Sequence, residues 1–203
     1  GADLGYMQRL AGQGEAESLE DARSLGRVFY RLADFPAPIV CAVQGAAIGG
    51  GLGLTVCVDY VLAEKTSVFA TSEVRLGIVP GVISPYIVRK IGLANAGPLM
   101  LSGRRIQAPE ARELGLVQEV VVPRELETSL QKAVAEFLYA GPHAARRTKA
   151  LLKRARPLPD PELMDFTARS IAQARCSEEG RQGVDAFFAK AVPPWAAGVE
   201  GLE

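Results

Sequence analysis

The chain has 203 residues, of which 48% are hydrophobic, so it is long enough to bury one sizeable core. Its 23 Lys and Arg residues balance 23 Asp and Glu residues, and a zero formal net charge argues against a protein that binds nucleic acid by neutralising phosphates. The three cysteines have spacings that match no metal site. The sequence shows no apolar run near the roughly 18 residues of a membrane span and no opening signal peptide. We therefore expect a cytoplasmic protein.

The first part of the chain alternates helical and strand patterns. Apolar residues three and four positions apart predict an amphipathic helix over 19–33, which the prolines that follow end. Residues 39–43 form a short run rich in β-branched side chains, which predicts a fully buried strand. Beyond a glycine-dense segment, we expect a buried helical stretch over 52–57 and strands over 58–63 and 68–70.

The remainder of the chain is mostly helical. We predict a strand over 116–122 and helices over 83–91, 94–101, 109–114, 125–139, 144–154, 162–175 and 178–190. Strands that alternate with helices, several of them entirely apolar, favour an α/β class with a parallel sheet. Because the last third contains only helical patterns, we expect two domains, an α/β body over 1–140 and a helical region over 141–203.

A cluster of glycines is the most informative part of the sequence. Gly49, Gly50 and Gly51 stand between the predicted buried strand and the predicted helix. Consecutive glycines cost backbone entropy, but they let a backbone approach a ligand closely. They also allow a helix to begin with bare N–H groups that face a site. Such groups are what a developing oxyanion needs.

Glycines in this number have three other common interpretations. A dinucleotide fingerprint fails, because Leu54 stands where a third glycine would be needed after Gly49 and Gly51. A phosphate-binding P-loop fails as well, since no Gly-Lys-Ser/Thr follows. Close packing of a helix on a strand explains the glycine content without any ligand, and it stays open.

Several longer motifs resemble one enzyme family. Residues 43–59 and 69–81 are similar to the middle signature of the enoyl-CoA hydratase/isomerase (crotonase) family. Residues 1–4 resemble its Ala-Gly-Ala-Asp-type turn, 102–117 its later Gly-Leu-Val segment, and 179–190 its C-terminal helix. The sequence of residues 72–77, together with Gly53, most resembles that of methylglutaconyl-CoA-type and carboxygeranoyl-CoA-type hydratases. The resemblance covers essentially the whole chain.

This resemblance implies a fold, an assembly and a substrate class. The family fold is a spiral of ββα turns followed by a helical trimerisation region. Its members form homotrimers or hexamers built as dimers of trimers, and they bind acyl-CoA without a metal or redox cofactor. Because the chain starts at the family's turn, we expect the opening strands of the spiral to be absent from it.

The resemblance also implies which residues hold the thioester. Two backbone amides bind its carbonyl oxygen in the family, and by position these belong to Ala2 and Gly50. An enolate places negative charge on that oxygen, so two preorganised amides stabilise it. We expect Gly49, Gly81 and Lys190 to take part in substrate binding together with Ala2.

The acid–base residues depart from the pattern of the family's hydratases. In those enzymes one glutamate lies three residues beyond the oxyanion-hole glycine, where this sequence has Gly53. A second glutamate lies in a Glu-x-x-Leu-Gly segment, and Glu73 matches it. We therefore expect Glu73 to be the catalytic carboxylate, since a single glutamate can move a proton between carbon and water.

Three functions follow as alternatives. The first is hydration of an α,β-unsaturated acyl-CoA by Glu73 alone, in fatty acid or branched-chain breakdown. The second is a double-bond isomerase, which needs only one base. The third is an acyl-CoA or RNA binder without catalysis, for which the basic residues of 146–156 are the only support; a solvated helix face is their simpler interpretation.

Other residues are weaker candidates for a role in the site or in the fold. A branched substrate with a distal carboxylate would need a cation, for which Arg75 and Arg89 are candidates. We expect His143 to have a capping or surface role and Asp59 to be a buried structural carboxylate. Cys41 and Cys57 are expected to be small core residues.

Overall fold

A computed structural model describes residues 15–73 and 79–155, together with single positions between 178 and 197. The chain divides into two compact units, each considered by itself. One comprises Gly1–Phe35 and Ile39–Leu130, and the other Pro36–Pro38 and Gln131–Glu203. The domain boundary expected at residue 140 stays a prediction.

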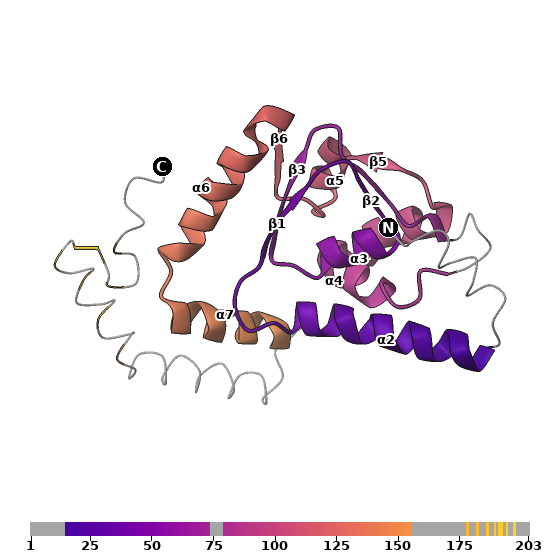
Figure 1. Cartoon of the computed structure of the whole chain (residues 1–203), viewed down its shortest axis with the longest axis horizontal. Coiled ribbons are helices and arrows are strands. Elements are labelled where there is room, and N and C mark those ends of the chain that lie inside the picture. Colours follow the sequence, from indigo (N-terminus) through magenta and orange to yellow (C-terminus); the bar gives the residue numbers. More distant parts are fainter. Residues whose placement is uncertain are drawn as a thin grey trace. The chain divides into compact units, whose positions relative to one another are not determined.

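Three parallel strands form the central sheet of the first unit (Figure 1). They are β1 (Val40–Val43), β3 (Tyr60–Glu64) and β6 (Glu119–Val121), in the order β1-β3-β6. Val40 lies opposite Tyr60, and Leu62 opposite Glu119. The central strand is buried on both faces, which explains its continuous apolar run and confirms the parallel sheet expected from the sequence.

A second small sheet leads into the glycine cluster. It contains β2 (Ala46–Ile48), β4 (Val68–Ala70) and β5 (Ile106–Gln107), in the order β2-β4-β5. The β2–β4 pair is parallel and the β4–β5 pair antiparallel. Sequence patterns did not predict β2, which lies within the glycine-dense segment, or β5, whose two residues are too few to show alternation.

Helices surround these sheets within the first unit. They are α2 (Glu15–Ala33), α3 (Gly50–Val56), α4 (Ser84–Ser102), α5 (Ala108–Glu113), the 3-10 helix η2 (Pro123–Glu125) and the start of α6 (Leu126–Leu138). The two helices predicted over 83–101 are one helix with a kink at Gly92, whose backbone angles are φ 73° and ψ 161°. The predicted break therefore marks the kink.

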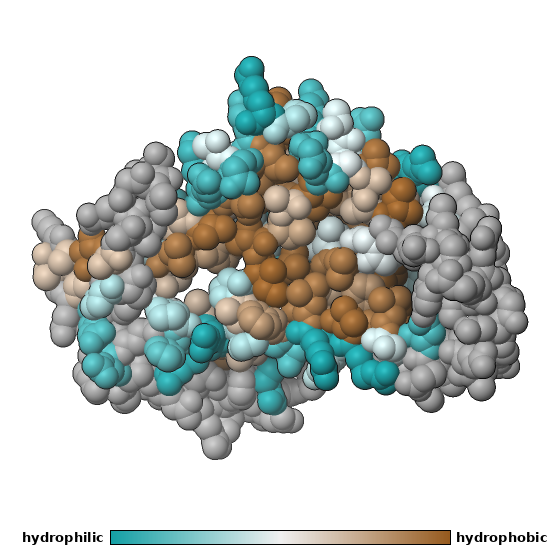
Figure 2. All heavy atoms as spheres, viewed as in Figure 1, coloured by the Kyte–Doolittle hydropathy of each residue, from teal (hydrophilic) through white to brown (hydrophobic). Residues whose placement is uncertain are grey.

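The core of the first unit lies among α2, α3, α4 and the strands. Its largest fully buried side chains include Phe29, Phe69, Leu52, Ile83 and Ile87. Figure 2 shows apolar side chains gathered over α3 and α4 on one face. Cys57 is buried and Cys41 half-buried, as expected of core residues. Among the described residues, no helix combines the length and apolar character needed to cross a membrane.

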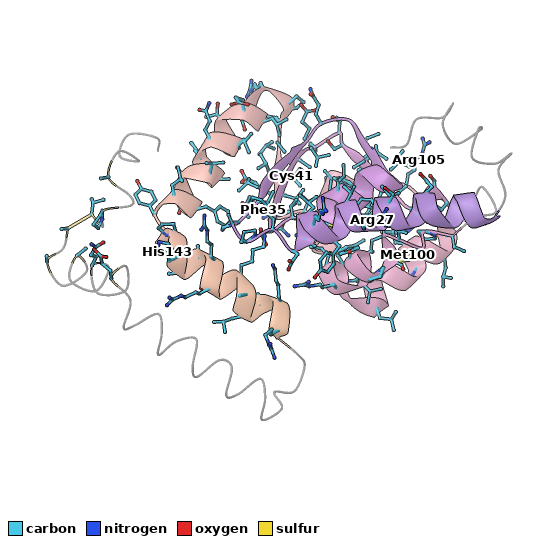
Figure 3. All side chains as sticks on the ribbon, turned by 60° about the horizontal axis from the view of Figure 1, so that its bottom comes forward. Arg27, Phe35, Cys41, Met100, Arg105 and His143 are labelled. Atoms are coloured by element: carbon cyan, nitrogen blue, oxygen red, sulfur yellow. The ribbon has the colours of Figure 1, made fainter. Side chains whose placement is uncertain are left out.

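The second unit contains the end of α6 and the whole of α7 (Pro142–Arg154). The basic residues of α7 do not form a single solvated face. Lys149 is only 7% exposed, and its Nζ donates a hydrogen bond to the Ala37 carbonyl at 2.9 Å. His143 is exposed on the first turn of α7, consistent with a surface role (Figure 3). The helices expected over 162–175 and 178–190 fall largely outside the described residues.

Candidate functional site

The site begins where β2 ends and α3 starts. Gly49 precedes the helix with φ 56° and ψ −120°, a conformation that favours glycine, and its N–H donates to the Ala70 carbonyl at 2.9 Å. Gly50 is the first residue of the helix, so its N–H has no partner within α3. A Cβ on Gly50 would meet no atom of the described residues within 4 Å, so these residues leave open space beside this backbone. This geometry suits an oxyanion donor, the role expected of Gly50.

Glu73 lies at the same end of α3, although it is distant in sequence. It follows β4 in a short turn that also contains Ser72. A Cβ on Gly49 would stand 3.1 Å from Glu73 Oε1 and 3.6 Å from its Cδ. The carboxylate therefore lies directly against the backbone that begins the helix.

The environment of Glu73 raises the pKa of its carboxyl. Its Oε2 is buried, and no residue in the described part of the chain gives that oxygen a hydrogen bond. Burial raises the pKa of Glu73, while a hydrogen bond from its own backbone amide acts in the opposite direction. A carboxyl with a raised pKa is better able to hold and return a proton, as acid–base catalysis requires.

Thr71 anchors the segment that carries Glu73. Its side chain is fully buried, and Oγ1 donates a hydrogen bond to the Leu99 carbonyl of α4 at 3.2 Å. The turn after β4 is thereby tied to a neighbouring helix. Sequence reasoning did not single out Thr71, because a lone threonine after a strand carries no signal of such a distant partner.

Gly53 occupies the next turn of α3, and its N–H donates to the Gly49 carbonyl at 3.0 Å. A Cβ at this position would stand 2.5 Å from Ile83 Cγ2 and 2.8 Å from both Cε1 and Cζ of Phe29. Real Cβ atoms essentially never approach other atoms so closely. The place of the family's first glutamate is therefore filled by two core side chains, which sequence reasoning did not connect with the site.

The other expected site residues are spread along the chain. Gly81 is exposed in the turn before α4, and its carbonyl accepts a hydrogen bond from Ser84 Oγ at 2.8 Å. Ala2 and Lys190 lie outside the described residues, as does Arg75. Arg89 is exposed on α4.

Asp59 corrects one expectation. It is exposed rather than buried, because it lies in the turn that leads into β3. Its structural role is nevertheless present: Oδ2 accepts a hydrogen bond from the backbone N–H of Ile39 at 2.7 Å. This bond ties the start of β3 to the segment that leads into β1.

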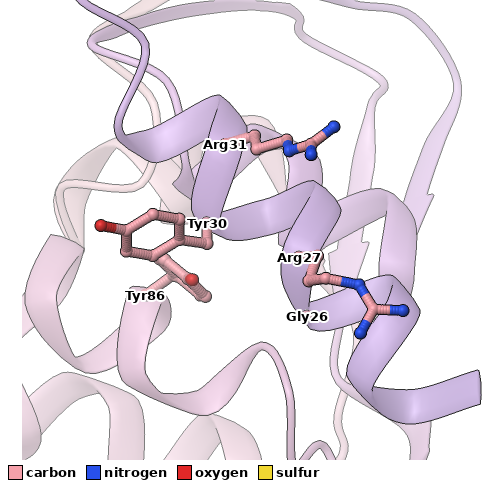
Figure 4. Close-up of a pocket in the computed structure, with 5 residues that line it drawn as sticks. All are labelled: Gly26, Arg27, Tyr30, Arg31 and Tyr86. Atoms are coloured by element: carbon pink, nitrogen blue, oxygen red, sulfur yellow. The ribbon is translucent and has the colours of Figure 1, made fainter. Parts of the chain in front are cut away.

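A pocket of about 450 Å³ opens between α2 and α4, lined by Gly26, Arg27, Tyr30, Arg31 and Tyr86 (Figure 4). None of the predicted site residues that the structure describes lines it. Its link to the site is through Phe29, whose ring centroid lies 6.2 Å from that of Tyr86. The same phenylalanine thus borders Gly53 and packs against the wall of this pocket.

The site brings a half-buried carboxyl, with Oε2 buried, to the start of helix α3, beside the short parallel strands β2 and β4. The family model for enoyl-CoA hydratase/isomerase matches residues 1–198. The chain belongs to the enoyl-CoA hydratase/isomerase family, as the sequence resemblance indicated, and the expected crotonase fold is confirmed. Members of this family act on acyl-CoA substrates.

Individual relatives agree with this assignment. A Thermus thermophilus relative, assigned to the enoyl-CoA hydratases, is 35% identical over 196 residues, covering 95% of this chain and 76% of its own. Crotonyl-CoA hydratase of Syntrophomonas wolfei is 31% identical, covering 94% of this chain and 72% of its own. The structure of Pseudomonas aeruginosa AtuE has a TM-score of 0.92 at 34% identity and covers 97% of this chain and 76% of its own. An enzyme of the hydratase (lyase) type, as predicted, is thus supported.

Proposed function

We propose that this chain hydrates an α,β-unsaturated acyl-CoA with Glu73 as its single acid–base carboxylate. The observation that carries this proposal is the position of the Glu73 carboxylate against Gly49, with one oxygen buried and unpaired among the described residues. The names of the relatives supply the reaction class.

The proposed reaction uses two groups at the start of α3. The amide of Gly50, with that of Ala2, holds the thioester oxygen and stabilises the enolate. Glu73 takes a proton from water as the water oxygen bonds to Cβ of the substrate, and then delivers that proton to Cα. The net change is the addition of one water molecule across the double bond. Gly49, Gly81 and Lys190 are proposed to contact the substrate, and no metal or redox cofactor enters these steps.

A panel of enoyl-CoA thioesters tests this proposal. We expect loss of conjugated absorbance with the wild-type protein and a fall of at least about a hundredfold in the Glu73→Gln variant. Glu113→Gln is the matched control, because Glu113 is an exposed glutamate on α5. Hydration that survives in Glu73→Gln would overturn the role of Glu73.

Gly53 favours a second candidate, a Δ3-Δ2 enoyl-CoA isomerase. With the position of a second carboxylate filled by Phe29 and Ile83, a reaction that needs one base fits the site well. Glu73 would take a proton from one carbon and return it two carbons away, so the double bond shifts and no water is added. Product analysis separates the two: a hydroxyacyl-CoA indicates the hydratase, and a shifted double bond the isomerase.

The sequences of the motifs and the family resemblance also suggest the acyl group and the oligomeric state. We propose a branched or carboxylated acyl group, because residues 72–77 resemble enzymes with such substrates. We also propose a homotrimer or a dimer of trimers, as in the family. Comparing straight, branched and carboxylated thioesters tests the first, and light scattering of the purified protein tests the second.

A further inference from the structure

Phe29 and Ile83 fill the space beside Gly53, and this limits the chemistry of the site. The inference rests on the function proposed above. Gly49 and Gly53 are one helical turn apart, about 6 Å along the axis. Each Cα–Cβ bond in a helix tilts toward the helix N-terminus. A side chain at 53 would therefore extend toward the end of α3 where the Glu73 carboxylate lies.

Two buried side chains prevent this. Phe29 comes from α2 and is 1% exposed, and Ile83 directly precedes α4 and is 2% exposed. Neither can turn into solvent. Phe29 also packs against Tyr86, with the two rings inclined at 56°. The packing of α2, α3 and α4 therefore excludes a second carboxylate, in addition to the glycine at position 53 itself.

We propose that Phe29 and Ile83 are specificity-determining residues that restrict this site to chemistry that Glu73 can perform alone. They do so by placing hydrocarbon where a second carboxylate would approach the substrate. A glutamate introduced at position 53 reaches a catalytic position only when Phe29 and Ile83 are both replaced by smaller side chains. The two residues act through the space they fill and donate no proton.

The test compares the effect of Gly53→Glu in two backgrounds, the wild-type chain and the Phe29→Leu/Ile83→Ala chain. Leucine lacks the ring atoms Cε1 and Cζ, and alanine lacks Cγ2, so the second background removes the three atoms that crowd position 53. In the wild-type background we expect Gly53→Glu to lower the thermal midpoint by about 5 °C or more and to give no gain in hydration. In the second background we expect it to raise hydration about tenfold over the parent and to add an ionisation to the pH–rate profile.

An equal effect of Gly53→Glu on hydration in both backgrounds would overturn the proposal. Gly53→Ala in the same two backgrounds supplies a readout that requires no activity. We expect it to lower the midpoint in the wild-type chain and to leave it nearly unchanged in the second background, and equal losses would also overturn the proposal. If Glu73→Gln keeps full hydration in the wild-type chain, the proposed function fails separately, while the alanine pair still decides whether Phe29 and Ile83 close the position.

Discussion

The carboxylate of Glu73 lies against the backbone of Gly49, close enough that a Cβ on Gly49 would stand 3.1 Å from Oε1. Gly49 has a positive φ of 56°, so a side chain there would be strained as well as crowded. One glycine therefore sets the start of α3 and leaves room for the acid beside it. This contact links the two segments of the sequence that carry the proposed chemistry.

Burial of Glu73 makes the stability of the protein depend on pH. The pKa of this carboxyl is higher in the folded chain than in the unfolded chain, so its ionisation costs stability. The cost is absent below the ordinary carboxyl pKa, where both states are protonated. It grows as the pH rises through that value toward the raised pKa of the folded state and is constant above it.

Glu73→Gln is therefore expected to be more stable than the wild type near neutral pH, because glutamine carries no charge to bury. The difference should shrink as the pH falls to about 4, where the wild-type carboxyl is increasingly protonated. Thermal midpoints measured from about pH 4 to about pH 8 check this, with the exposed Glu113→Gln as control. A wild type more stable than Glu73→Gln at neutral pH would contradict it.

Gly53 and Gly50 make a matched pair for substitution in α3. Gly53→Ala places a methyl group 2.5 Å from Ile83 Cγ2, and overpacking of this kind costs about 1–3 kcal/mol. Gly50→Ala meets no atom within 4 Å, and alanine is the better helix former, so its stability should match or exceed the wild type. Urea unfolding of both variants measures the difference. Equal losses would show that space around α3 does not separate the two positions.

Much of the fold could be predicted because its buried segments have strong patterns. The continuous apolar runs of β1 and β3 and the three-and-four spacing of α2 were visible in the sequence. The strands β2 and β5 could not be predicted, since β2 lies within the glycine-dense segment and β5 has only two residues; each is defined by its pairing with β4. Leu116 and Val117 were predicted to belong to the strand that became β6, but their N–H groups donate to the Ala111 carbonyl of α5.

The site could be predicted only as far as its motifs reach. Family resemblance pointed to Glu73, and the structure brings its carboxylate to the glycine cluster. Phe29 and Ile83 could not be found in this way, because they belong to ordinary apolar patterns and meet Gly53 only through the packing of α2 and α4. Asp59 shows the opposite error: its place among apolar residues suggested burial, but the turn before β3 exposes it.

Thr71 is expected to position Glu73 through its hydrogen bond to Leu99. Thr71→Val keeps the shape of the buried side chain and loses the bond. The Leu99 carbonyl retains the N–H of Gly103 at 3.0 Å, so the cost in stability should be near the net value of one bond, about 1 kcal/mol.

We expect Thr71→Val to lower kcat roughly tenfold with little change in KM, because misplacing the carboxyl affects the transition state most. Thr71→Ser keeps the hydroxyl and should restore most of kcat. Steady-state kinetics on the best thioester of the panel separates these outcomes. A Thr71→Val enzyme with normal kcat would show that the turn after β4 holds Glu73 without this bond.

Lys149 offers a test of the second unit that is independent of the site. Its aliphatic stem is buried in α7, and Nζ donates to the Ala37 carbonyl. Lys149→Met keeps a buried unbranched chain of similar helix propensity and removes the donor. The half-buried carbonyl then loses this partner, so we expect a loss of about 1 kcal/mol.

Arg146→Met is the control, because Arg146 is an exposed residue of the same helix. Its effect should stay within about 0.5 kcal/mol, the range of ordinary surface changes. Urea unfolding of the two variants compares them directly, and both should keep their activity, since neither residue belongs to the proposed site. A Lys149→Met protein as stable as Arg146→Met would mean that solvent replaces the lysine at the Ala37 carbonyl at no cost.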